Sequence, residues 1–396
     1  MTLSEELTWR GFVNQTTFKD ITELDKAPLT FYWGVDPSAT SMTIGNFAMA
    51  MMVRHFIAHG HKAILLVGGA TGMIGDPDGK AEERQLKSIE EVTTFKNGII
   101  DQYRQIFDGM DFEIVDNYDW FKNIGYLDFL REVGKHMSMT QLLDRDFVQS
   151  RIGKGGAGIS YAEFSYSLIQ GYDFLHLFRE KGATLQVAGA DQWGNSLSGV
   201  ELIRKLEGHE AHVWTGPLIV NKATGKKFGK TEAGAIWLDA QKTSVFDFYQ
   251  FWLNADDEGV IYYMKIYTLL PKEEIEDLER QTKENPAARA AQKALAYEIT
   301  KIVHGAEAAD QAVKATEQLF AGGDSELTPT VDVKPGEYSV VELLVKAELA
   351  ASNSEARRLF QQGGVKLNQE KVTHETVTVQ SGDLLQVGKR KFAKIA

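Results

Sequence analysis

Three polar side chains recur at helical spacing in the middle of the chain. Tyr166, Gln170 and Asp173 stand at positions i, i+4 and i+7, so a helix over this segment places them on one face. The residues around them are mostly large and apolar, which predicts that this stripe faces a pocket. A solvated helix face is the alternative interpretation, although tyrosine is an unusual residue for one. We therefore treat the three as candidate ligand-binding residues.

A second set of candidates lies on the turn between a predicted strand, 30–35, and a predicted helix, 44–58. This turn carries Asp36, Ser38 and Gly45. Backbone N–H groups at a helix start attract phosphate, and a glycine there lets an adenine approach the backbone. The turn therefore predicts a nucleotide site, with an ordinary capped helix start as the alternative.

A third set follows the predicted strand 184–187. Gly189, Asp191 and Gln192 stand directly after it. An acid just beyond a strand end suits the hydroxyl pair of a ribose. An N-cap role for Asp191 is the competing interpretation, and the two are compatible.

Two glycine-containing loops complete the candidates. Residues 68–77 hold four glycines and end near Asp76, the candidate functional group of that loop; a tight structural loop is the alternative. Residues 226–231 are basic and end in Gly-Lys-Thr, but Thr224 stands where a P-loop requires glycine and no clear helix follows. We therefore expect a lysine loop that meets phosphates, and not a P-loop nucleoside triphosphatase.

Strands and helices alternate through the first part of the chain, which positions these candidates. Apolar strands are predicted at 63–67 and 112–115 in addition to the two above, and a long amphipathic helix near 85–107. This alternation predicts an α/β domain with a parallel sheet, whose ligands lie outside the carboxyl ends of the strands. Residues 244–320 read as helices only, with a break at Asn285-Pro286, and a linker begins near Gly322.

A compact C-terminal module is predicted over residues 338–396. A capping box at Ser352–Glu355 opens a helix, and a short strand follows at 365–368. Basic side chains on this helix and the adjoining turn favour a phosphate-binding face, with a solvated surface as the alternative. The candidate RNA-binding residues are Arg357, Arg358, Lys366 and Lys371.

Composition excludes several classes of protein. The chain has 396 residues and no cysteine, so disulfides, thiolate metal sites and thiol nucleophiles are impossible. No apolar run reaches the roughly 18 residues that a membrane span needs, and the N-terminus lacks a signal-peptide core. We expect a cytoplasmic protein without a bound structural metal. The net charge of −12 disfavours general polyanion binding but permits a local basic patch.

The order of these motifs resembles that of bacterial tyrosyl-tRNA synthetases, which are class I aminoacyl-tRNA synthetases. The resemblance runs from about residue 8 to the end. Each motif alone is unspecific, but their combination is highly specific. It is carried by Tyr-Trp-Gly-Val-Asp-Pro, Val-Gly-Gly-Ala-Thr-Gly-Met-Ile-Gly-Asp-Pro, Asn-Tyr-Asp-Trp, Glu-Phe-Ser-Tyr, Gln-Gly-Tyr-Asp-Phe, Ala-Asp-Gln-Trp-Gly-Asn and Lys-Phe-Gly-Lys-Thr.

The resemblance implies an architecture. It implies a Rossmann-like catalytic domain at 1–240, with a segment near 110–180 inserted to build a homodimer interface. An α-helical anticodon-side domain at 241–322, a linker at 323–337 and an RNA-binding module of a ribosomal-protein type at 338–396 would follow.

The resemblance also implies a reaction and site residues. The enzyme would activate L-tyrosine with ATP and Mg²⁺, then esterify it to the terminal adenosine of tRNA(Tyr). Tyr32 and Asp173 would hold the phenolic hydroxyl, and Asp76, Tyr166 and Gln170 the ammonium group. ATP or its adenylate would contact Gly34, Asp36, Ser38, Gly45, Gly189, Asp191, Gln192 and Lys230, while the catalytic residues would be Thr43, Asn46, Lys227, Lys230 and Thr231.

Two positions depart from the family pattern. The first nucleotide signature ends in Thr43-Ile44-Gly45-Asn46, where the family has histidines at the first and last of these positions. Trp33 stands where the family commonly has cysteine. We expect Thr43 and Asn46 to replace the lost hydrogen-bond donors, with the threonine reaching phosphate through water.

Three alternatives stay open from sequence. They are a paralogue that forms adenylates without charging RNA, a non-catalytic RNA-binding protein on the same scaffold, and the tryptophan-specific sister enzyme. Asp173 and Tyr32 argue against the last, because indole has no hydroxyl to bind.

Overall fold

The structure, a computed structural model, describes residues 1–77, 87–153, 155–222, 225, 228–231, 234–320, 330–388 and 391–396. The chain forms two compact units, the first made of residues 1–228 with Lys265–Thr268 and the second of residues 229–264 with 269–396. The predicted boundary at 240 is therefore late, and the first unit also includes a short returning segment. Over the described ranges, every helix is too short or too polar to cross a membrane.

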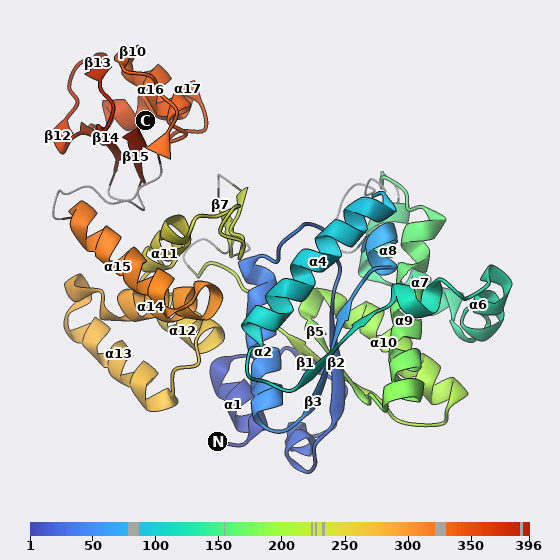
Figure 1. Ribbon diagram of the computed structural model, residues 1–396. Helices are drawn as coiled ribbons and strands as arrows, with labels where there is room; N and C mark the ends of the chain where they lie inside the picture. The colour runs from blue at the N-terminus through green and yellow to red at the C-terminus, as the bar shows by residue number, and fades with distance from the viewer. Residues whose placement is uncertain are drawn as a thin grey trace. The chain divides into compact units, whose positions relative to one another are not determined.

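A six-stranded sheet forms the centre of the first unit (Figure 1). All neighbouring strands are parallel except β1, which pairs antiparallel with β6. The order β1-β6-β5-β2-β3-β4 reverses direction at β2, and such a reversal opens a crevice at the carboxyl ends of the strands. The strands are β1 (Gln15–Thr16), β2 (Thr30–Val35), β3 (Lys62–Val67), β4 (Phe112–Asp116), β5 (Leu185–Gly189) and β6 (His212–Gly216).

Helices cover both faces of this sheet, with α2 and α4 on one side and α9 and α10 on the other (Figure 1). The parallel α/β architecture predicted from sequence is confirmed. Helix α2 has the predicted bounds, and Gly60 just beyond it adopts the left-handed conformation (φ +87°). The helices are α2 (Ile44–Ala58), α4 (Ile89–Ile106), α9 (Tyr161–Lys181) and α10 (Trp193–Leu206).

Short elements connect these layers. The glycine-rich loop after β3 contains one helical turn, α3 (Thr71–Ile74), and 3-10 helices occur at Ile21–Asp25 and Ala190–Gln192. The segment between β4 and α9 contains only short helices, whose apolar residues pack beside Leu168 and Tyr172 of α9. These are α5 (Tyr118–Phe121), α6 (Tyr126–Glu132), a 3-10 turn (Gly134–His136), α7 (Met139–Leu143) and α8 (Asp146–Ile152).

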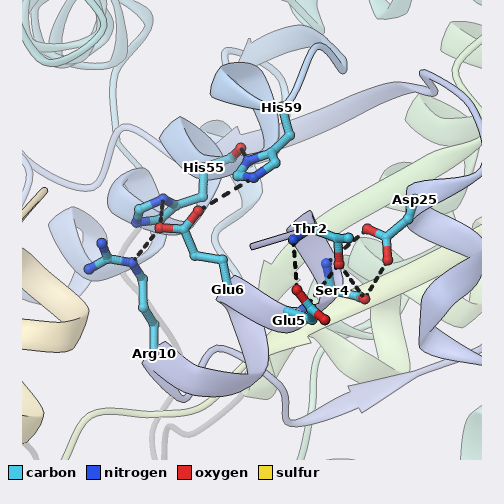
Figure 2. A network of polar contacts seen from close by, with 8 residues as sticks. All are labelled: Thr2, Ser4, Glu5, Glu6, Arg10, Asp25, His55 and His59. Atoms are coloured by element: carbon cyan, nitrogen blue, oxygen red, sulfur yellow. Dashed lines mark hydrogen bonds and ion pairs between the residues drawn. The ribbon is translucent and has the colours of Figure 1, made fainter. Parts of the chain in front are cut away.

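The carboxylate of Glu6 links helix α1 (Leu3–Arg10) to the C-terminal end of α2 (Figure 2). Glu6 Oε1 accepts from Arg10 Nε at 2.9 Å and lies 3.3 Å from His55 Nδ1, while Oε2 lies 3.5 Å from His59 Nε2. Arg10 also donates to the carbonyl oxygens of Lys265 and Thr268, at 2.9 and 3.0 Å. This cluster therefore fixes the returning segment to the first unit.

The second unit begins with a small hairpin and continues as helices. Strand β7 (Lys230–Thr231) pairs antiparallel with β8 (Gly234–Ala235). The predicted break is confirmed, because α13 ends at Glu284 and a 3-10 turn starts at Pro286. The helices are α11 (Val245–Leu253), α12 (Val260–Tyr267), whose last residues from Lys265 belong to the first unit, α13 (Lys272–Glu284), α14 (Ala290–His304) and α15 (Ala306–Phe320), with the 3-10 turn at Pro286–Ala288.

The C-terminal module has its own core of aliphatic residues under two helices. Its five-stranded sheet has the order β12-β11-β14-β15-β9, and β10 pairs with β13. Half of the predicted capping box forms: Ser352 Oγ accepts Glu355 N–H at 3.2 Å, but the Glu355 carboxylate binds the N–H of Ala351. The elements are β9 (Thr330–Val331), β10 (Gly336–Ser339), α16 (Val340–Lys346), α17 (Asn353–Gln361), β11 (Val365–Leu367), β12 (Glu370–Lys371), β13 (Thr376–Val379), β14 (Leu384–Val387) and β15 (Lys391–Ile395).

The linker predicted over 323–337 is therefore wrong in its second half. Strand β9 pairs with β15 and β10 pairs with β13, so the module already includes residues 330–337. These strands are too short to produce a readable alternation of polar and apolar residues. The first half of the predicted linker, 323–329, lies outside the described residues.

Candidate active site

A cavity of about 220 Å³ lies at the carboxyl edge of the sheet. It is bounded by the ends of β2 and β5, the glycine-rich loop and the polar stripe of α9. Eleven predicted site residues line it: Tyr32, Gly34, Asp36, Ser38, Asn46, Asp76, Tyr166, Gln170, Asp173, Asp191 and Gln192. Residues predicted from four separate sequence segments therefore meet around one space.

Asp173 is the most deeply buried carboxylate of this cavity, with 2% of its surface exposed. Its Oδ1 accepts from Trp120 Nε1 at 2.9 Å and its Oδ2 from Asn117 Nδ2 at 3.1 Å. Burial raises the pKa of Asp173 well above its usual range, while these two donors oppose that shift. The two N–H groups fix both oxygens in place and leave their remaining lone pairs for a ligand.

Tyr32 lies beside this carboxylate on strand β2. Burial, and secondarily the charge of Asp173, raises the pKa of its phenol well above the ordinary value. Its hydroxyl is buried and has no hydrogen-bond partner among the described residues, and the same holds for Gln186 Oε1 on the adjacent strand β5. Unpaired buried polar atoms are costly, so both atoms indicate that the cavity is built for a polar ligand.

The predicted ammonium-binding residues are already linked to the predicted nucleotide residues. Tyr166 Oη donates to Asp36 Oδ2 at 2.7 Å, and Thr71 Oγ1 donates to Asp36 Oδ1 at 2.6 Å. Gln192 Nε2 donates to Asp76 Oδ2 at 2.5 Å. Asp36 and Asp76 both line the first cavity, and two carboxylates there suit a cationic group of a ligand.

A second cavity, of about 190 Å³, adjoins the first. The two share Gly34, Val35, Asn46 and Asp191. The wall of the second cavity combines glycines and apolar side chains with the polar Thr43, Asn46 and Asp191, which suits a planar base and a ribose. Its other lining residues are Trp33, Thr43, Gly45, Met49, Gly189, Pro217, Leu218, Ile219 and Phe228.

The two residues that replace the family's histidines bind each other. Asn46 Oδ1 accepts both the backbone N–H of Thr43, at 3.1 Å, and its hydroxyl, at 3.0 Å. The expectation that the Thr43 hydroxyl donates toward phosphate does not fit this geometry, because Asn46 takes that proton. The Asn46 Nδ2 group donates to no described residue and remains available to a ligand in the adjoining cavities.

Asp191 does not cap a helix. It lies inside the 3-10 turn Ala190–Gln192, and the residue before α10 is Gln192, which makes no side-chain cap hydrogen bond. Of its two interpretations, the capping role is therefore wrong. Asp191 lines both cavities instead.

The lysine loop is described only in part. Lys227 lies outside the described residues, and for Lys230 and Thr231 the backbone alone is described, as strand β7. A hairpin follows, and the next described helix begins at Val245. A P-loop requires a helix directly after its Gly-Lys-Thr, whereas Lys230 and Thr231 form the first strand of a hairpin here.

The four candidate RNA-binding residues are all exposed on the C-terminal module. Arg357 and Arg358 lie on α17, and none of the four forms an ion pair with any residue that the structure describes. Lys366 and Lys371 stand directly opposite each other on paired strands. The two lysines repel each other in this arrangement. Together with the two arginines they give this part of the module a local excess of positive charge.

Comparison with known proteins agrees with this geometry. The model of the class I tRNA synthetases (W and Y) matches residues 24–321. The chain belongs to this family. The model of the Tyrosine--tRNA ligase SYY-like C-terminal domain matches residues 320–392.

Individual relatives cover almost the whole chain. The tyrosine--tRNA ligase of Bacillus caldotenax is 47% identical over 94% of this chain and 92% of its own length. Tyrosine--tRNA ligase 2 of Bacillus cereus is 41% identical over 100% of this chain and 99% of its own. The solved C-terminally truncated mitochondrial tyrosyl-tRNA synthetase of Aspergillus nidulans is 29% identical, with a TM-score of 0.73 over 81% of this chain and 94% of that one.

Four residues of this synthetase's site received no role from sequence. Asn117 and Trp120 bind Asp173, Thr71 binds both Asp36 and Asn117, and Gln186 lines the cavity. Three of them lie in motifs that carry the family resemblance, Asn-Tyr-Asp-Trp and the glycine-rich loop, so the motifs themselves held the signal. Gln186 lies within an apolar strand. Its amide side chain among apolar neighbours was the only sign in the sequence that it could belong to a site.

The described residues contain no cluster of three or more histidine, aspartate or glutamate side chains that could hold a metal ion. The charged side chains that line the two cavities are the carboxylates of Asp36, Asp76, Asp173 and Asp191.

Proposed function

We propose that this chain is a tyrosine--tRNA ligase that activates L-tyrosine with MgATP and transfers it to tRNA(Tyr). The observation that carries the proposal is the buried pair at the base of the first cavity. Asp173 is held there by two donors, and the Tyr32 hydroxyl beside it has no described partner. A phenolic hydroxyl can donate to the carboxylate and accept from Tyr32, which satisfies both groups.

The tryptophan-specific function of the same family fits this site poorly. Indole has no hydroxyl at the corresponding end, so Asp173 and Tyr32 would remain buried without a ligand partner. An amino acid in the first cavity and a nucleotide in the second would lie side by side, because the two cavities share lining residues.

The activation step needs little proton chemistry. The ionised carboxylate of tyrosine attacks the α-phosphorus, a new carboxylate oxygen–phosphorus bond forms, and the bond to pyrophosphate breaks. Asp76, Tyr166 and Gln170 would orient the ammonium group, and Asn46, Lys227 and Lys230 would stabilise charge on the phosphates. Positioning and charge stabilisation of this kind supply most of the catalysis of such transfers.

The second step requires RNA. A ribose hydroxyl of the terminal adenosine attacks the carbonyl carbon of the adenylate, and AMP leaves. Arg357, Arg358, Lys366 and Lys371 are proposed to bind the phosphates of tRNA. A polyanion would relieve the repulsion between Lys366 and Lys371 across β11 and β12.

A homodimer is proposed through the segment between β4 and α9. Large apolar side chains are exposed there and at the start of α9, including Tyr126 (63%), Leu127 (72%), Met139 (57%) and Tyr161 (62%). Exposed apolar side chains gathered along one segment of a soluble domain are typical of a subunit interface. A cytoplasmic location stays a prediction.

Tyrosine-dependent ATP–pyrophosphate exchange tests the activation step, with phenylalanine as the competing substrate. We expect tyrosine to be preferred by roughly 10⁴–10⁵, a magnitude that comes from this enzyme family itself and not from the geometry. Activation of phenylalanine within about tenfold of tyrosine would show that the assignment of Asp173 and Tyr32 is wrong.

A parallel assay addresses the missing histidines. Loss of one hydrogen-bond donor typically costs about 3–4 kcal/mol of transition-state stabilisation, which slows an enzyme without silencing it. We therefore expect exchange by the natural sequence. Exchange that occurs only in the Thr43→His, Asn46→His double variant would mean that the natural site is inactive. Charging of tRNA(Tyr), assayed with all twenty amino acids, separates a full ligase from a protein that only forms adenylates.

A further inference from the structure

Helix α4 packs against the loop that leads into the first nucleotide signature. The loop residues Thr40, Ser41 and Met42 directly precede Thr43, Gly45 and Asn46, which line the second cavity. Two residues of α4, Gly98 and Gln102, contact this loop. They stand four positions apart and therefore lie on one helix face.

Gly98 permits a contact that no other residue would allow. A β-carbon at this position would lie 2.0 Å from the carbonyl oxygen of Thr40 and 2.9 Å from its carbonyl carbon. These are backbone atoms, so the clash could be relieved only if the loop or the helix moved. A glycine inside a helix costs about 1 kcal/mol relative to alanine. The close approach accounts for its presence in the middle of α4.

Gln102 fixes the next two loop residues through both ends of its amide. Its Oε1 accepts the backbone N–H of Met42 at 2.7 Å, and its Nε2 donates to Ser41 Oγ at 2.8 Å. Ser41 Oγ in turn donates to the carbonyl oxygen of Met42 at 2.8 Å. Gln102, Ser41 and Met42 are 8%, 4% and 1% exposed, so water cannot readily replace these bonds.

We propose that Gly98 and Gln102 are positioning residues for ATP. They set where Thr43, Gly45 and Asn46 stand in the second cavity, without touching the nucleotide. Asp173, the carboxylate proposed to bind the tyrosine hydroxyl, is held by Asn117 and Trp120 and not by α4. Loss of the α4 contacts should therefore weaken the use of ATP and spare the binding of tyrosine. This inference rests on the proposed assignment of the second cavity to nucleotide.

Three variants of graded severity test it, each in the full chain. Gly98→Ala forces the loop away from α4, and Gln102→Met removes both amide bonds at similar volume. Ser41→Ala removes the hydroxyl that accepts from Gln102 and donates to the carbonyl oxygen of Met42. Asn97→Ala is the matched control, because Asn97 is exposed on the same helix. The measurements are ATP and tyrosine KM and kcat in pyrophosphate exchange, tyrosine affinity by equilibrium dialysis, and the thermal unfolding midpoint.

We expect kcat/KM for ATP to fall by up to about 100-fold in Gly98→Ala, since a misplacement of about 1 Å can have that effect. Smaller losses should follow in Gln102→Met and then in Ser41→Ala, while tyrosine affinity stays within about twofold in all three. Equal losses in kcat/KM for ATP and in tyrosine affinity would mean that the α4 contacts only stabilise the fold, and would overturn the proposal. Unchanged ATP parameters in Gln102→Met and Ser41→Ala would also overturn it, even if Gly98→Ala failed to fold. Absence of exchange in the natural chain would instead overturn the proposed function.

Discussion

The carboxylate of Asp173 is held by groups that stand far from it in sequence. Trp120 and Asn117 follow strand β4, and Asn117 also donates to Thr71 of the glycine-rich loop at 3.0 Å. Each bond restricts Asp173 to one orientation. Discrimination by a buried polar pair depends on such restriction, because a carboxylate that could turn away would no longer penalise phenylalanine.

Trp120→Phe tests this support directly. The change removes the donor to Asp173 Oδ1 and keeps a ring beside His176, on which Trp120 is stacked. A hydrogen bond to a charged group contributes about 1.5–3 kcal/mol, so kcat/KM for tyrosine should fall about tenfold to hundredfold. The preference over phenylalanine should shrink while KM for ATP stays unchanged. Trp237→Phe, which lines neither cavity, is the control, and an unaltered preference would argue against the supporting role.

Lys230→Ala concerns the other substrate. The lysine is proposed to meet charge that develops as pyrophosphate leaves, so its loss should lower the rate of adenylate formation with tyrosine affinity nearly unchanged. Single-turnover adenylate formation beside equilibrium binding of tyrosine measures the two separately. Parallel losses in rate and in tyrosine affinity would contradict the assignment.

Residues that follow a local period could be predicted from sequence, and residues joined across the fold could not. Tyr166, Gln170 and Asp173 were recognisable because helical spacing places them on one face. The bond between Thr71 and Asn117 depends on two loops, 46 positions apart, meeting at one edge of the sheet. The pairing of Thr43 with Asn46 was missed for another reason, since two donors were expected where one residue satisfies the other.

At the scale of elements, the last turn of α12 supports both nucleotide segments. Tyr267 is fully buried; its ring stacks on Phe47 of α2 with centroids 6.0 Å apart, and it lies 6.2 Å from the ring of Phe228. Phe47 follows Asn46, and Phe228 lies in the lysine-loop motif and lines the second cavity. One aromatic ring thus connects the two segments proposed to bind ATP.

Tyr267→Leu should therefore lower kcat/KM for ATP, by roughly tenfold, more than it lowers tyrosine binding. Tyr267→Phe keeps the ring and should behave like the natural chain. Pyrophosphate exchange at varied ATP, together with tyrosine dialysis, distinguishes the two substrates. If Tyr267→Phe were as impaired as Tyr267→Leu, the stacking argument would fail.

The contact between α1 and α2 should make the first unit sensitive to acid (Figure 2). Burial, aided by Arg10, His59 and Arg54, lowers the pKa of His55 well below its ordinary value. Glu6 lies 3.3 Å from His55 Nδ1 and favours the charged form, but burial outweighs it, and a proton on the buried, unpaired Nε2 would find no described acceptor. The unfolded chain thus binds this proton at a higher pH than the folded one.

Stability from His55 is accordingly complete above about pH 6.5, its unfolded pKa, and is lost as the pH falls from there toward the folded-state pKa. The thermal unfolding midpoint of the natural chain should drop over this range. His55→Gln should show a shallower drop, because glutamine does not titrate. Parallel pH profiles for the two proteins would exclude His55 as a cause.

Element positions were the most predictable level of this fold. Strands β2 to β5 and helices α2, α4 and α9 appear where apolar periodicity and turn residues predict them, because each buries a long regular face. Domain boundaries were less accurate. Strands β9 and β10 cover two and four residues, and only their partners in the module identify them.

For the whole molecule, removal of the C-terminal module separates the two steps of the reaction. Deletion should begin at residue 330, since a cut at 338 would leave β9 and the first half of β10 without their partner strands. The truncated chain should retain pyrophosphate exchange and lose most charging of tRNA(Tyr). The change should also reduce the dependence of RNA binding on salt concentration. Normal charging by the truncated chain would show that the basic face is only a solvated surface.

The returning segment Lys265–Thr268 has a consequence for biosynthesis. The first unit is continuous only to Phe228, and residues 229–264 belong to the second unit. Chains emerge from the ribosome N-terminus first, and domains fold as units as they emerge. The contacts of Arg10, Phe47 and Phe228 with this segment can form only after Lys265, Tyr267 and Thr268 have been synthesised. These three residues follow the hairpin and helix α11 in the chain. The nascent chain should therefore complete its catalytic core only when α12 has left the exit tunnel, and pausing before that point would expose the unfinished nucleotide cavity to chaperones.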